Sequence, residues 1–156
     1  MEFGAHLKTA GGAHKAAERA GEIGADALQI FTQSPRMWHH PDVDPDAAAR
    51  FRAARTEHGI GTVTCHATYL INLGATDEDV YARSVEALRK TMLMAQAYEA
   101  DGVVFHLGSH LGALVARPEF FDVYLELAVD FALPFRLSGA STVLRWACRS
   151  SESGST

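Results

Sequence analysis

Three histidines each follow a short apolar run of the kind that forms buried β-strands, and they are the side chains best suited to chemistry. They are His6, His66 and His106. Because the carboxyl ends of parallel strands meet at one edge of a sheet, we expect the three imidazoles to converge there. One such histidine is more often an ordinary core residue. Three at equivalent strand ends favour a metal site, since neutral imidazole is the commonest protein metal ligand.

The predicted metal site is incomplete as a catalytic zinc site. Two or three imidazoles alone still need a carboxylate or a further nitrogen to complete a catalytic site. No aspartate or glutamate stands at the end of a predicted fifth strand. The pair Gly11 and Gly12 resembles a phosphate-binding turn, but a glycine pair more often only permits the turn from strand to helix.

The elements that position these histidines alternate between short β-rich runs and helical patterns. Asp44 is the expected N-cap of one helix, with Pro45 at its first position, and Thr76 is the expected N-cap of another. Four βα units in a row predict an α/β fold with parallel strands. The predicted strands cover 3–7, 27–32, 62–66 and 102–106, and the helices lie in 12–24, from 45, from 77 and after 118.

The regular alternation weakens near Pro134, so we divide the chain into a folded part, 1–133, and a divergent tail, 134–156. Val143-Leu144-Arg145-Trp146 is a candidate fifth strand, although no helical pattern follows it. The last residues, 149–156, are mostly serine with glycine and threonine. This composition predicts an irregular, disordered end.

Composition limits the classes of function. The 156 residues are 47% hydrophobic, which suits one globular domain, and the net charge of −5 excludes a broadly basic DNA-binding surface. Cys65 and Cys148 lie far apart without CxxC spacing, so neither a disulfide framework nor a thiolate zinc site is indicated. No signal segment or membrane-spanning run is present, and we expect a cytoplasmic protein.

A set of short motifs resembles the endonuclease IV family of apurinic/apyrimidinic (AP) endonucleases in order and spacing. The resemblance extends from about Phe3 to Leu133, the N-terminal half of that fold. The matching segments are Gly4-Ala5-His6-Leu7 with Ala10-Gly11-Gly12, Phe31-Thr32 with Arg36 and Trp38, His66 with Tyr69-Leu70-Ile71-Asn72-Leu73-Gly74, and Phe105-His106-Leu107-Gly108-Ser109-His110.

The resemblance implies a partial (β/α)8 TIM barrel similar to xylose isomerase. It also implies a DNA repair enzyme that uses three zinc ions to hydrolyse the phosphodiester 5′ of an abasic site. His66 and His106 match two ligands of one zinc. Arg36, Tyr69 and Leu70 match residues that insert into DNA at the lesion. Without the motifs, Tyr69 and Leu70 would be read as a cap on the barrel end and Arg36 as a solvated charge.

One part of the family pattern is missing. The family has a zinc-bridging glutamate after strand five, where this sequence has Thr142-Val143-Leu144-Arg145-Trp146-Ala147-Cys148. We therefore assign no catalytic residue and expect weak or no activity from this chain. The change of pattern suggests, as a hypothesis, a frameshift followed by a premature stop, or a mispredicted gene end. Half a barrel would also leave the edges of strands one and four open, which predicts self-association or a poorly stable open sheet.

Two alternative functions remain open at this point. One is a sugar isomerase or epimerase of the xylose isomerase-like type, which also places histidines on a divalent metal at strand ends. Arg36, Tyr69 and Leu70 argue against it, because a small sugar needs no DNA wedge. The other is a half-barrel fragment that binds DNA or another half barrel without chemistry.

Overall fold

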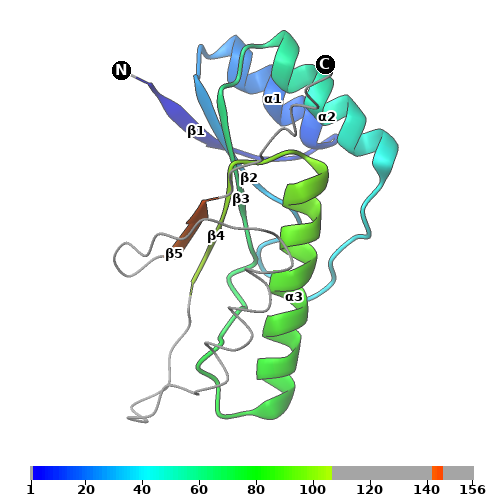
Figure 1. The fold of residues 1–156 in the computed structure, drawn as a ribbon, viewed down its shortest axis with the longest axis vertical. Helices are drawn as coiled ribbons and strands as arrows, with labels where there is room; N and C mark the ends of the chain where they lie inside the picture. The colour runs from blue at the N-terminus through cyan, green and yellow to red at the C-terminus, as the bar shows by residue number, and fades with distance from the viewer. Residues whose placement is uncertain (1, 107–141, 146–156) are drawn as a thin grey trace, which may run out of the picture.

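The computed structural model describes residues 2–106 and 142–145, and its strands form one sheet in the order β1-β2-β3-β4-β5. Strands β1 to β4 pair in parallel, and helices α1 to α3 connect them in turn (Figure 1). The predicted partial barrel with four parallel strands is therefore confirmed. The elements are β1 (Gly4–Leu7), α1 (Ala13–Glu22), β2 (Ala27–Phe31), α2 (Pro45–Glu57), β3 (Thr62–His66), α3 (Glu78–Ala97), β4 (Gly102–Phe105) and β5 (Thr142–Arg145).

Strand β5 lies within one residue of the candidate strand at 143–146, but it runs opposite to β1 to β4. It pairs antiparallel with β4, with Val103 opposite Leu144 and Phe105 opposite Thr142. The main-chain groups on this side of β4 therefore have partners, and the prediction that β4 forms an open edge is wrong. Strand β1 is an edge of the sheet among the described residues. The predicted boundary near 133, the helix after Pro118 and the end of the tail lie outside the described residues.

The core lies between the helices and one face of the sheet. Alternate strand residues point to opposite faces, and the apolar ones, such as Ile30, Val63 and Phe105, are fully or nearly fully buried in this core. The helices contribute both small and large buried residues to this core. They include Ala16, Ala17, Ala20, Phe51, Leu88 and Met92. The other face of the sheet carries the intervening residues, among them His6, Gln29, Phe31, Thr64 and His66.

The helix starts follow capping chemistry. The Asp44 carboxylate accepts hydrogen bonds from the amides of Asp46 (2.9 Å) and Ala47 (3.2 Å), and Pro45 takes the first helical position, as predicted. The prediction of Thr76 as the N-cap of α3 is off by one residue. Asp77 is the cap, because its carboxylate accepts a 3.0 Å bond from the Val80 amide. None of the helices in the described ranges is long and apolar enough to cross a membrane.

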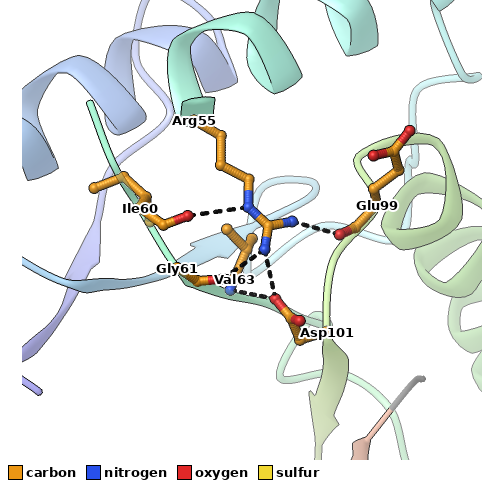
Figure 2. Close-up of polar contacts among 6 residues, drawn as sticks. All are labelled: Arg55, Ile60, Gly61, Val63, Glu99 and Asp101. Atoms are coloured by element: carbon orange, nitrogen blue, oxygen red, sulfur yellow. Dashed lines mark hydrogen bonds and ion pairs between the residues drawn. The ribbon is translucent and has the colours of Figure 1, made fainter. Parts of the chain in front are cut away.

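A single arginine ties together the chain at the amino ends of β3 and β4. The Arg55 guanidinium, at the end of α2, donates to the carbonyls of Ile60 (3.2 Å), Gly61 (2.7 Å) and Glu99 (2.5 Å), and it forms a 2.9 Å ion pair with Asp101. The same Asp101 oxygen accepts a 2.8 Å bond from the Val63 amide. Figure 2 shows this group, which we call the Arg55 clamp. It joins the loop before β3 to the turn before β4.

Candidate functional site

Five rings meet at the carboxyl ends of the parallel strands. They are His6, Phe31, His66, Tyr69 and His106, and we call them the strand-end cluster. His66 is central, with ring centroids 4.8 Å from Phe31, 5.5 Å from Tyr69, 5.4 Å from His106 and 5.9 Å from His6. The predicted convergence of the three histidines is therefore present in the structure.

His66 is held in the form that a metal ligand requires. Its side chain is buried, with 7% exposure, and its Nδ1 lies 2.7 Å from the Ala67 carbonyl oxygen. A carbonyl can only accept, so Nδ1 carries the proton and Nε2 keeps its lone pair. Burial lowers the pKa of His66, with the Ala67 hydrogen bond opposing and the neighbouring His106 and His6 adding to the decrease. The ring is therefore neutral at neutral pH.

His106 follows β4 directly and is exposed. Its ring lies 5.4 Å from that of His66 at an angle of 51°. Imidazole nitrogens bind zinc at roughly 2.0–2.1 Å, so two rings at this separation can reach a common ion. Within residues 2–106 and 142–145, however, no group of three or more histidine, cysteine, aspartate or glutamate side chains could hold a metal ion. The carboxylate or further nitrogen that we expected to complete a catalytic site is thus not among the described residues.

His6 belongs to the cluster but has a different environment. It lies opposite Gln29, which in turn lies opposite Thr64, whereas Phe31 lies opposite His66 one step further along the strands. The Gln29 side-chain nitrogen is 3.0 Å from His6 Nδ1, and the Thr64 hydroxyl donates to the Gln29 oxygen at 3.2 Å. Burial also lowers the pKa of His6. The partner of Nδ1 is thus a side chain at His6 and a main-chain carbonyl at His66.

The residues predicted to contact DNA lie on two loops that are joined to each other. Tyr69 is 53% exposed and Arg36 is exposed, while Leu70 is half-buried. The Pro35 carbonyl accepts one bond from the Tyr69 amide (3.0 Å) and another from the Thr68 hydroxyl (2.8 Å). The loop that carries Arg36 and the loop that carries Tyr69 and Leu70 are therefore fixed relative to each other. Arg36 itself is not part of the strand-end cluster.

Both loops are also anchored to the body of the fold. Ile71 and Leu73 are buried in the core, and the Asn72 amide donates to Ser84 of α3 at 2.9 Å. On the other loop, His40 is buried, with Nε2 3.1 Å from the Thr32 hydroxyl and Nδ1 donating to the Pro41 carbonyl at 2.8 Å. These anchors leave the Tyr69 ring exposed while its backbone is held in place.

Sequence reasoning missed several members of this site. Thr68, which joins the two loops, gave no periodic signal because it lies in a loop. The support given by Gln29 and Thr64 follows from strand register, which pairs residues 35 positions apart. Phe31 was part of the recognised motif, yet its role as a ring between His6 and His66 was not predicted.

Comparison with known proteins gives one family. The model of the xylose isomerase-like TIM barrel family matches residues 17–132. A probable endonuclease 4 of Halorhodospira halophila is 46% identical over 112 residues, which cover 72% of this chain and 38% of that protein. Endonuclease IV from Thermus thermophilus has a similar structure, with a TM-score of 0.73 and 31% identity, covering 91% of this chain and 54% of that one.

More distant structures share only the fold. A D-psicose 3-epimerase has a TM-score of 0.55 at 15% identity, covering 85% of this chain and 47% of that one. The chain spans about two fifths of the length of the curated endonuclease 4 relatives. It therefore belongs to the xylose isomerase-like TIM barrel family, within which its N-terminal part resembles endonuclease IV.

Proposed function

We propose that this chain forms part of the active site of a zinc-dependent DNA repair endonuclease that cleaves the phosphodiester 5′ of an abasic site. One observation carries the proposal: the ring centroids of His66 and His106 lie 5.4 Å apart, beside the ring of the exposed residue Tyr69. A pair of metal ligands and an aromatic wedge at one strand edge suits a lesion in DNA. The likeness to endonuclease IV supports the same function.

In this proposal His66 and His106 hold one zinc ion through nitrogen. The residues present fit that role, because the Nδ1 bond of His66 to Ala67 leaves Nε2 available. Zinc would supply a Lewis acid for the phosphate and lower the pKa of a bound water. The described residues add no carboxylate to this pair. We therefore expect the chain alone to bind zinc weakly and to cleave DNA weakly or not at all.

Tyr69, Leu70 and Arg36 would contact the DNA. A missing base leaves a gap in the stack that an aromatic and an aliphatic side chain can fill, and an arginine can bind the adjoining phosphate. The net charge of −5 gives no general attraction to DNA. Binding must then depend on local cations such as Arg36 and should be weak, because few cationic side chains are available to displace counterions from the DNA. A cytoplasmic location remains part of the proposal.

The test measures zinc content and binding of duplexes with and without an abasic-site analogue. We expect preference for the abasic duplex, loss of zinc in His66→Ala, and no change in the control His39→Ala, an exposed loop histidine. Equal binding of both duplexes would contradict the DNA repair proposal. Turnover of a ketose, without preference for the abasic duplex, would instead favour a sugar isomerase or epimerase. Abasic binding without zinc would favour a non-catalytic DNA-binding half barrel.

A further inference from the structure

Neighbouring histidines of the strand-end cluster have opposite hydrogen-bond partners. Nδ1 of His66 faces a carbonyl oxygen at 2.7 Å, whereas Nδ1 of His6 faces the side-chain nitrogen of Gln29 at 3.0 Å. A carbonyl accepts and an amide nitrogen only donates. Nδ1 of His66 is therefore protonated and Nδ1 of His6 is not. The two rings are nearly parallel, 17° apart, with centroids separated by 5.9 Å.

The Gln29 side chain contacts both neighbouring strands. Gln29 pairs with His6 on one side and with Thr64 on the other, so the three side chains form one row on the inner face of the sheet. The Thr64 hydroxyl donates to the Gln29 oxygen at 3.2 Å, and the Gln29 amide nitrogen lies 3.0 Å from His6 Nδ1. A neutral imidazole has one N–H, so that of His6 lies on Nε2.

We propose that His6 is a binding residue that donates its Nε2 hydrogen to an anionic oxygen of the substrate, and that Gln29 is the positioning residue that keeps it from serving as a metal ligand. The inference rests on the proposed function in its choice of anion, a phosphodiester oxygen of DNA. His6 is exposed and borders an open cavity of about 320 Å³ that Gln29 and Thr64 also line. The His6 side chain therefore borders space that a ligand can enter.

The different protonated nitrogens of His6 and His66 explain why three converging histidines do not make a three-ligand metal site. His66, with its Nε2 lone pair, can bind a cation, and His6, with an Nε2 hydrogen, can bind an anion. His6 also lies in a different row of the sheet from His66. A cation and an anionic oxygen placed side by side are what a metal-bound phosphodiester presents.

The test reads the position of each proton by NMR of the full chain with 15N-labelled histidine at pH 8. We expect the Nε2–H form for His6 and the Nδ1–H form for His66. Added zinc should shift the His66 and His106 signals and leave the Nε2 hydrogen of His6 in place. Added dimethyl phosphate should shift the His6 signal. An Nδ1–H form of His6, or its loss of Nε2–H on adding zinc, would overturn the proposal.

Gln29→Glu supplies the matched variant. A carboxylate accepts where the amide donated, so the His6 proton should move to Nδ1, and dimethyl phosphate should bind roughly tenfold more weakly because a charged hydrogen bond is lost. Thr62→Asp is the control, since it adds the same charge to the inner face without lying opposite His6. Equal weakening in both variants would mean simple charge repulsion and contradict the role of Gln29. If the unaltered chain binds dimethyl phosphate but binds the abasic duplex no better than the intact duplex, only the proposed function fails.

Discussion

The two ends of the parallel strands use their polar groups differently. At the amino ends, the Arg55 clamp satisfies three carbonyls, one amide and one carboxylate with a single guanidinium and its ion-pair partner. At the carboxyl ends, His106 and the Tyr69 ring are exposed, and the described residues give Nε2 of His66 no hydrogen-bond partner. The polar groups at the amino ends are hydrogen-bonded within the protein, whereas those at the carboxyl ends are available to a ligand. We therefore expect substitutions at the amino ends to change stability and those at the carboxyl ends to change binding.

The largest loss of stability should follow Arg55→Ala. It leaves the Asp101 carboxylate and three carbonyls without this donor, and we expect the free energy of unfolding to fall by about 2–3 kcal/mol. Urea unfolding of the full chain measures it. Arg50→Ala is the control, because Arg50 is exposed on the same helix. An equal effect in both variants would mean that the Arg55 clamp has no special role.

A smaller loss of stability should follow Thr68→Val, a substitution that we expect to affect binding as well. The hydroxyl is fully buried and joins two binding loops through the Pro35 carbonyl. We expect a loss of about 1 kcal/mol, because Pro35 keeps its bond from the Tyr69 amide. Binding of abasic duplex should weaken as well. Thr56→Val, at an exposed hydroxyl of α2, is the control for the change to valine; binding unaffected by Thr68→Val would show that the loops keep their arrangement without this bond.

Mild acid should destabilise the carboxyl-end region. Burial lowers the pKa of His40 and of His66 below the ordinary value of 6.5 that the unfolded chain retains. Just below pH 6.5 these two histidines therefore bind protons in the unfolded chain while they remain neutral in the folded chain. The stabilisation is complete above pH 6.5 and is lost as the pH falls from 6.5 through the folded pKa values. Thermal unfolding at pH 5 and pH 8 should show this difference, and His40→Gln should reduce it; an unchanged difference would exclude His40 as a source.

The smallest effect on stability, and the largest difference between the effects on binding and on stability, should come from Tyr69→Ala. Because 53% of this residue is exposed, we expect a change in unfolding free energy of at most about 1 kcal/mol, the scale of its ring contacts. Preference for abasic duplex should fall roughly tenfold, which is the scale of one lost aromatic stack. Fluorescence anisotropy with both duplexes measures it. Strong destabilisation with unchanged binding would reverse the comparison between the two ends.

Local rules predicted the fold better than the site. The four parallel strands and the Asp44 cap followed from periodicity and capping chemistry, and even the error at Thr76 was one residue. The direction of β5 was not predictable, because a strand-like run of four residues does not say which way it pairs. The convergence of the histidines followed from strand ends. Their protonation did not, because it depends on Ala67 for one ring and on Gln29, 23 positions away, for the other.

Strand β5 also limits how copies of this chain could assemble. A sheet with two free edges can add copies at both, and repeated addition gives an open filament. Here β5 occupies the side of β4, so among the described elements the two edge strands are β1 and β5. Pairing β1 with β1 of a second copy leaves β5 as the edge strand of each copy. We therefore expect association by strand pairing to involve β1 or β5 and to leave β4 with its partner in the same chain.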